Sequence, residues 1–379
     1  MSGTLINKIL KLPMRFIKKK YKWVSRTKTF DYLIVDESGS DVVKPCIKAK
    51  YSYKVLPLRS NVRLLNHSII TFFLFQIHLV ILKRINLKGS YILAVSRALK
   101  SSVIVTMIDN NSWCKGLHDA GYVRIVMIQN GIRDANELDL LPPYDVLFGY
   151  PRNKPRNYIG NEYYGVGNIK SSMILYKKSQ DENIKNQVLF VSQYRSDRAE
   201  PIFLSSHLVQ WVAKFALLRK MSLVIALNSI TPSTRIAEEQ MYRNLLKTPF
   251  NCTSRVDDYL ASYRAIINSR IVIGCNSSLL VESLAMGVPT LLCWNQFILH
   301  EETYNNNVLY FDREEFNQFS TIANSTYLDF EKKADEIITL SNTIRSEFIN
   351  KIRSDYCEFS PESDIIKSIQ NRLEKLLKN

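Results

Sequence analysis

Short apolar runs that end in polar clusters recur along this chain, and segments of helix length separate them. The runs are rich in β-branched residues and are too short for helices, so they predict strands. With the polar clusters that end them, the runs occupy Phe30–Val43, Tyr51–Arg59, Ser101–Trp113, Gly121–Asp134, Tyr144–Pro151, Asn186–Arg195, Met221–Asn228 and Arg270–Gly274. Strands that alternate with helices form βαβ units, in which the strands are parallel. Because 379 residues are too many for one ordinary core, we expect two Rossmann-like α/β domains.

Changes in composition suggest where the domains begin and end. Residues 152–183 are rich in Asn, Lys, Gly and Tyr, which is typical of a connection between domains. We expect a basic amphipathic segment at 1–28, an N-terminal Rossmann-like domain at 29–165 and a C-terminal Rossmann-like domain at 166–345. The charged, helical pattern of 346–379 predicts a C-terminal helix that crosses back to the N-terminal domain.

Polar clusters follow the predicted strands at their carboxyl ends. Ligands of open parallel sheets bind beyond these ends, so the clusters should share one cleft between the domains. They are Asp36-Glu37-Ser38, Asp109-Asn110-Asn111, Gln129-Asn130-Gly131, Ser192–Arg195 and Cys275–Ser278.

The segment Ile271–Trp294, IVIGCNSSLLVESLAMGVPTLLCW, is the most informative part of the sequence. It combines a buried strand, a small-residue turn, a short helix and a second strand. Unpaired N–H groups and the positive end of the helix dipole would point into the cleft, where Gly274, Asn276, Ser277 and Ser278 leave room for a phosphate. Glu282 lies one turn into the helix and is a candidate to bind ribose hydroxyls. The alternative is that the serines only cap the helix and that Glu282 is solvated.

The sequence lacks the patterns of two common nucleotide-binding classes. Neither a G-x-G-x-x-G nor a Walker A pattern occurs, which argues against a dinucleotide oxidoreductase and a P-loop NTPase. The six cysteines form no C-x-x-C pair, and the five histidines have no metal-ligand spacing. We therefore expect no metal site and no cofactor.

The net charge of +16 indicates an anionic partner, and the charge is uneven. Residues 1–28 carry nine Lys or Arg and no acid. This stretch either lies on an anionic membrane surface, with its aliphatic side chains inserted, or forms a solvated basic tail. Residues Leu64–Leu82 are long enough to span a bilayer, but Asn66, His67, Gln76 and His78 favour a buried helix of an α/β domain.

The motif NSSLLVESLAMGVPTLLCW (276–294) resembles the nucleotide-sugar-binding end of GT-B glycosyltransferases. In these enzymes a small-residue loop, a helix carrying Glu and a G-x-P break precede a strand. VIVTMIDNN (103–111) and VMIQNGIRD (126–134) resemble bacterial enzymes of capsule and O-antigen assembly, some of which transfer Kdo from CMP-Kdo. The resemblance covers the layout of residues 30–350 and implies a metal-independent transferase with a GT-B-like fold. It also implies that the domain at 29–165 binds the acceptor and that the domain at 166–345 binds the nucleotide-sugar donor.

The resemblance also implies roles for individual residues. Asp109 would be the catalytic carboxylate, acting as a base or as a nucleophile, and Asp36 and Glu37 are its rivals. Each assignment has a structural alternative, such as a helix cap for Asp109 or an ordinary turn for Asn130-Gly131. The acceptor side would comprise Asn110, Gln129, Asn130 and Arg133, and the donor nucleotide would be bound by Ser192, Arg195, Asn276, Ser277, Ser278 and Glu282.

These observations predict a glycosyltransferase that moves a sugar from a nucleotide-activated donor, CMP-Kdo-like or a UDP- or GDP-sugar, to a lipid-linked surface polysaccharide. We expect it in the cytoplasm, on the inner face of the membrane, with its basic N-terminal segment on anionic lipid. One alternative is an epimerase of the UDP-sugar 2-epimerase type, which has the same two-domain layout. The other is a basic nucleic-acid-binding protein, but no RNA- or DNA-binding motif is present and we expect no nucleic-acid partner.

Overall fold

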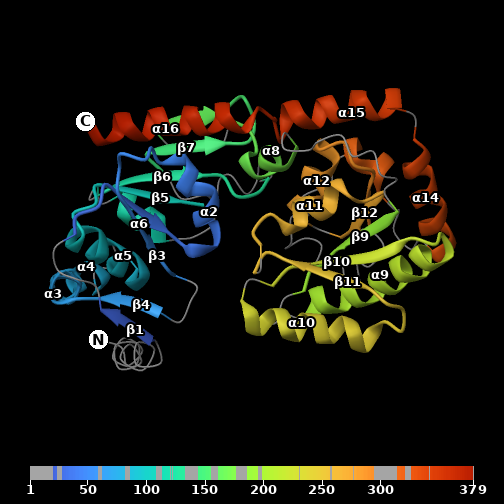
Figure 1. The fold of residues 1–379 in the computed structure, drawn as a ribbon, viewed down its shortest axis with the longest axis horizontal. Helices are drawn as coiled ribbons and strands as arrows, with labels where there is room; N and C mark the ends of the chain where they lie inside the picture. The colour runs from blue at the N-terminus through green and yellow to red at the C-terminus, as the bar shows by residue number, and fades with distance from the viewer. Residues whose placement is uncertain are drawn as a thin grey trace.

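The computed structural model contains two units, each built on a parallel sheet (Figure 1). It describes residues 20–23, 28–58, 62–81, 86–107, 113–119, 121, 123–132, 144–154, 161–175, 186–194, 199–229, 231–256, 258–275, 277–293, 314–320, 326–340 and 342–378. The two sheets confirm the predicted α/β class with two Rossmann-like domains.

The first unit has a six-stranded sheet in the order β3-β2-β5-β6-β7-β8. Alternating side chains of each strand face opposite sides of the sheet. Leu33 and Val35 of β2 therefore pack with α5 and α6, whereas Tyr32 and Ile34 pack on the other side, with α2 and the C-terminal helix α16 (Glu362–Lys378). The strands are β2 (Tyr32–Val35), β3 (Tyr53–Leu56), β5 (Val103–Thr106), β6 (Arg124–Ile128), β7 (Val146–Gly149) and β8 (Glu162–Gly165), and the helices are α2 (Ser40–Val43), α5 (Leu87–Ala98), α6 (Trp113–Asp119) and α8 (Ile169–Leu175).

A smaller parallel pair lies at the outer edge of the first unit. Strand β1 (Lys20–Trp23) pairs with β4 (Val62–Leu65), which leads into α3 (His67–Phe75) and α4 (Ile77–Ile81). The expectation of one buried helix over Leu64–Leu82 is therefore wrong in part. Ile69 is buried, but Leu74 is 58% exposed and Phe75 is 71% exposed. No helix among the described residues is long and apolar enough to cross a membrane.

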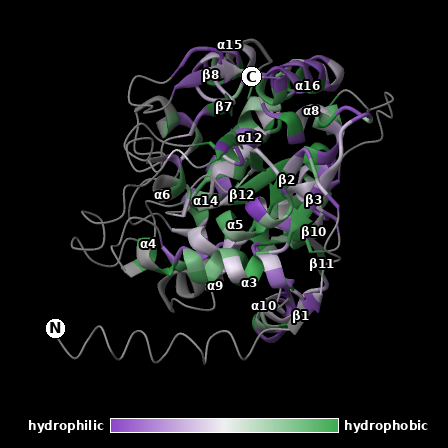
Figure 2. Ribbon diagram, turned by 90° about the vertical axis from the view of Figure 1, so that its left-hand side faces the viewer, coloured by the Kyte–Doolittle hydropathy of each residue, from purple (hydrophilic) through white to green (hydrophobic). Residues whose placement is uncertain are grey.

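The second unit has a five-stranded sheet in the order β11-β10-β9-β12-β13. Strands β9, β10, β12 and β13 are almost wholly buried, and Figure 2 shows hydrophobic colours around β10 and β12, whereas β11 is polar and only its last residue, Ser254, is buried. The strands are β9 (Gln187–Val191), β10 (Ser222–Leu227), β11 (Asn251–Ser254), β12 (Ile271–Gly274) and β13 (Thr290–Leu292). The helices are α9 (Ala199–Leu218), α10 (Pro232–Leu245), α11 (Ala261–Ile267), α12 (Ser278–Ala285), α14 (Tyr327–Thr339) and α15 (Asn342–Asp355).

The C-terminal helices run across both units (Figure 1). Helix α15 packs against α12 in the second unit, and α16 (Glu362–Lys378) lies on the sheet of the first. The apolar face of α16 is buried, and its Glu374 accepts hydrogen bonds from Lys48 and Lys50, each at 2.6 Å. These ion pairs hold the pKa of Glu374 well below its usual range.

Two local expectations are wrong. Residues 152–183 are not only a connection, because they contain β8 and α8, which are too short to show a clear periodic pattern in the sequence. The sequence Ser254–Ile266 predicts a helix that is capped near Ser254, but Ser254 ends β11, and α11 begins only at Ala261.

Candidate functional site

The turn between β12 and α12 lies where the two units meet. Ser277 is the N-cap of α12, and its hydroxyl accepts a hydrogen bond from the Leu279 N–H at 3.3 Å. Gly274 is needed for packing, because a Cβ there would lie 3.1 Å from a Leu280 methyl group. Ser278 faces the first unit, where a Cβ on Gly131 would approach its Oγ to 2.9 Å. The polar turns after β6 and β12 are thus in close contact.

Glu282 is buried, with only 1% of its surface exposed, so the alternative of a solvated helix residue is wrong. Its Oε2 accepts hydrogen bonds from Asn168 Nδ2 at 2.8 Å and from the Tyr263 hydroxyl. Burial, followed by the charge of Glu282, raises the pKa of Tyr263 well above its ordinary value, so this phenol remains a donor. Glu282 therefore links α12 to α11 and to the loop before α8.

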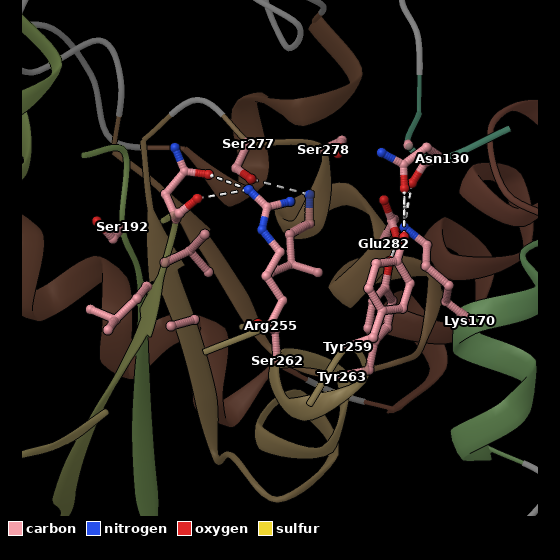
Figure 3. Close-up of a pocket in the computed structure, with 16 residues that line it drawn as sticks. Asn130, Lys170, Ser192, Arg255, Tyr259, Ser262, Tyr263, Ser277, Ser278 and Glu282 are labelled. Carbon is pink, nitrogen blue, oxygen red and sulfur yellow. Dashed lines mark hydrogen bonds between the residues drawn. The ribbon is translucent and has the colours of Figure 1, made fainter. Parts of the chain in front are cut away.

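A cavity of about 190 Å³ opens at this junction, and polar side chains from both units line it (Figure 3). Asn130 and Gly131 come from the turn after β6, and Lys170 comes from α8. The remaining lining residues belong to the second unit: Val191, Ser192, Ala226, Leu227, Asn228, Arg255, Tyr259, Ser262, Tyr263, Ser277, Ser278, Leu279 and Glu282.

Two cationic side chains contribute to the lining. Lys170 is 6% exposed, donates a hydrogen bond to the Asn130 carbonyl, and has its ammonium 5.2 Å from the centre of the Tyr263 ring. Arg255 donates to the Asn228 carbonyl at 2.7 Å, and Figure 3 shows its guanidinium pointing toward Ser277. A cavity with two cations at a helix N-terminus favours an anionic ligand.

A second buried carboxylate, Glu238 of α10, holds the strand ends that form one side of this cavity. Glu238 has no exposed surface. One of its oxygens accepts from the Ser192 hydroxyl at 2.5 Å and from the Asn228 N–H at 3.0 Å. The other accepts from the N–H and the hydroxyl of Ser229, at 2.9 and 2.5 Å. Because Asn228 accepts the Arg255 hydrogen bond, Glu238 indirectly positions Arg255.

The structure brings five of the proposed site residues together, and they are Asn130, Ser192, Ser277, Ser278 and Glu282. Gln129 does not line the cavity but supports its edge, donating to the Gly131 carbonyl at 2.9 Å and accepting from the Tyr150 N–H at 2.8 Å. Five others lie outside the described residues, and they are Asp109, Asn110, Arg133, Arg195 and Asn276.

The two rival carboxylates follow β2, away from the cavity lining. Asp36 is 2% exposed and has a φ of +83°, a conformation that non-glycine residues rarely adopt. Glu37 accepts a hydrogen bond from the Leu58 N–H at 2.8 Å and so secures the loop after β3. Among the residues described, neither is part of the cavity wall.

Sequence reasoning missed several residues of the site, notably Asn168, Lys170, Glu238 and Arg255. Lys170 and Asn168 belong to the stretch interpreted as a connection, and Arg255 belongs to a stretch interpreted as helix. The N-cap Thr231 and the first helical residue Pro232 of α10 were a local signal that could have placed Glu238 on a helix. Within the described part of the chain, no group of three or more His, Cys, Asp or Glu side chains could hold a metal ion.

No protein-family model matches the chain, and no curated protein sequence matches it. Solved structures do show similarity. A variant of the wall teichoic acid polymerase TagF has 11% identity and a TM-score of 0.55, over 99% of this chain and 98% of that chain. The complex of Staphylococcus aureus MnaA with UDP has 13% identity and a TM-score of 0.53, over 93% of this chain and 97% of that chain.

A third structure, UDP-GlcNAc 2-epimerase from Neisseria meningitidis bound to UDP-GlcNAc, has 13% identity and a TM-score of 0.48. It covers 92% of this chain and 99% of that chain, but at this score it supports no argument. At these identities the first two similarities establish the fold alone, and they confirm the GT-B-like arrangement of two Rossmann-like domains.

Proposed function

We propose that this chain is a glycosyltransferase that uses a nucleotide-activated sugar and a surface-glycan acceptor. The observation that carries the proposal is the cavity at the start of α12, which is lined from both units and contains Lys170 and Arg255. In a GT-B-like fold, this position beyond the carboxyl ends of the strands is where a ligand is expected to bind. Two similar structures are consistent with such a ligand, since TagF was soaked with CDPG and MnaA is in complex with UDP.

The residues of the cavity suit the departure of a nucleotide. Charge accumulates on the leaving phosphate as the bond to the sugar breaks. Arg255, Lys170 and the N–H groups at the start of α12 would stabilise that charge without a metal ion. Ser277 and Ser278 would contact the same phosphate, and Arg195 and Asn276 remain candidates beside them. Glu282 would act by holding α11 and α12 in register, with its second oxygen available for a ribose hydroxyl.

The acceptor side requires a group that removes a proton from the attacking hydroxyl. Asp109, which follows β5 in the sequence, remains our first candidate, and Asp36 is the second. Glu37 is a weaker candidate because its carboxylate already secures the Leu58 N–H. Asn110, Gln129, Asn130 and Arg133 would lie on the acceptor side of the cavity.

The remaining assignments concern domains and location. Residues 29–165 would present the acceptor and residues 166–345 the donor, with 346–379 returning to the first unit. A lipid-linked polysaccharide acceptor would place the enzyme on the inner face of the cytoplasmic membrane, with residues 1–28 on anionic lipid. The donor could be CMP-Kdo, as in enzymes of O-antigen or capsule assembly, or a UDP- or GDP-sugar.

Calorimetric titration with CMP, CDP, UDP, GDP and dTDP tests the donor site. We expect one nucleotide to bind preferentially, and Arg255→Ala to weaken its binding about tenfold or more by removing a charge from the cavity. Arg264→Ala is the matched control, because Arg264 is an exposed arginine on α11 that pairs with Asp258 outside the cavity. Its Kd should change less than about twofold. Equal effects of the two substitutions, or no nucleotide binding at all, would refute the site.

A second assay separates a transferase from an epimerase. A transferase releases nucleotide from the preferred nucleotide-sugar in proportion to added lipid-linked acceptor. An epimerase converts the sugar configuration without any acceptor. Sugar conversion that is independent of acceptor would replace our proposal with the epimerase alternative.

A further inference from the structure

The helix pair α3–α4 exposes a stripe of large apolar side chains. Ile70, Leu74 and Ile77 have helical spacing and are 39%, 58% and 41% exposed, and Phe75 beside them is 71% exposed. The opposite side of α3 is anchored, because Ile69 is buried and Phe72 and Phe73 pack against the core. The stripe is therefore the outer face of the packed helix pair α3–α4.

Strand β1 extends this face. Trp23, which is 59% exposed, pairs in register with Leu65 just before α3, and its ring lies 5.0 Å from that of His67. Figure 1 shows β1, β4, α3 and α4 together at the outer edge of the first unit. Scattered apolar side chains on a surface are ordinary, but a contiguous group of this kind marks a contact surface. We refer to Trp23, Ile70, Leu74, Phe75 and Ile77 as the apolar face.

The charge around the apolar face indicates what covers it. Residues 1–108 contain 20 Lys and Arg against four Asp and Glu, whereas the remaining 271 residues contain 31 of each. The whole positive excess of the chain thus belongs to the part that carries this face. Residues 64–82 contain no charged side chain, yet Arg63 precedes them and Lys83-Arg84 follows them, and β1 itself contains Lys20 and Lys22.

From these observations we propose that the apolar face is inserted into the surface of an anionic phospholipid bilayer. Apolar and aromatic side chains enter the boundary between headgroups and acyl chains, while flanking lysines and arginines contact lipid phosphates. A second copy of the chain is a poorer partner, because pairing these faces would bring together two copies of residues 1–108, each with 20 Lys and Arg against four Asp and Glu. A nucleic acid would match the charge but leave the apolar side chains in water. This inference does not depend on the nucleotide chemistry proposed above.

The full-length chain should co-sediment with phosphatidylcholine vesicles that contain about one-third phosphatidylglycerol, and much less with phosphatidylcholine alone. The variant L74S/F75S should reduce the partition coefficient at least about tenfold, because it removes two apolar side chains from the lipid. The matched control is L217S/L218S on α9, where the two leucines are similarly exposed, at 63% and 53%. It should bind vesicles like the wild type.

Several results would overturn the proposal. They are absence of vesicle binding, equal binding to both lipid compositions, or equal loss in L74S/F75S and L217S/L218S. A dimer in light scattering that L74S/F75S dissociates, with vesicle binding unchanged, would assign the face to a second copy. If L74S/F75S unfolds at a lower temperature than the wild type, L74A/F75A, which keeps a high helix propensity, replaces it in the same comparison.

Discussion

Replacement of Glu238 by alanine removes the acceptor of four hydrogen bonds that join α10 to the ends of β9 and β10. Two of the donors are backbone N–H groups, which cannot turn away to find another partner. Each unpaired buried donor costs roughly 1–3 kcal/mol. Because water can enter the space left by the side chain, we expect a total loss of about 3–5 kcal/mol in the free energy of unfolding.

Glu238→Gln refines the test. The amide oxygen can still accept both hydrogen bonds from Ser229, but its NH2 group then faces the Asn228 N–H, and two donors cannot pair. We expect a smaller loss, about 1–3 kcal/mol. Nucleotide affinity should also fall, since Asn228 holds Arg255.

Urea unfolding followed by tryptophan fluorescence gives these free energies. The control is Glu239→Ala on the same helix, because Glu239 pairs at 2.6 Å with a half-exposed arginine, Arg243. An exposed i,i+4 pair contributes about 0.3–0.5 kcal/mol. If Glu238→Ala and Glu239→Ala differ by less than about 0.5 kcal/mol, the buried carboxylate does not hold the strand ends and our reasoning fails.

Two further predictions concern the neighbouring turns. Gly131→Ala should lower the free energy of unfolding, measured in urea, because the new Cβ would lie 2.9 Å from Ser278 Oγ. Adding Ser278→Ala should restore the fit between the turns, and a double mutant with no better stability than Gly131→Ala would contradict this. Burial raises the pKa of the Cys275 thiol to about 12 from an ordinary value of 9.0. The folded state therefore favours the protonated thiol, so its stabilising contribution is complete below pH 9.0 and is lost as the pH rises toward about 12. Unfolding free energies measured across this range should fall more steeply for wild type than for Cys275→Ala, and parallel curves would refute the assignment.

Local patterns in the sequence were sufficient to predict several strands and part of the candidate site. Runs such as Val103–Thr106 and Ile271–Gly274 are short, apolar and rich in β-branched residues, so a few adjacent residues are enough to predict each strand. Ser277 and Ser278 were recognisable because a small-residue turn between a strand and a helix has a local signature. Glu282 was identified as a site residue, but its burial was not expected, because its donors Asn168 and Tyr263 come from distant parts of the chain.

The sequence by itself determined the α/β class, the parallel strands and the concentration of positive charge at the N-terminal end. These properties depend on neighbouring residues or on simple counts. Only the tertiary structure decided which polar groups share the cavity, because Asn130, Lys170 and Arg255 come from distant parts of the chain with no common motif. It also decided that the apolar sequence over α3 and α4 has one anchored face and one exposed face. An apolar side chain is buried only when another element covers it, and coverage is a property of the whole fold.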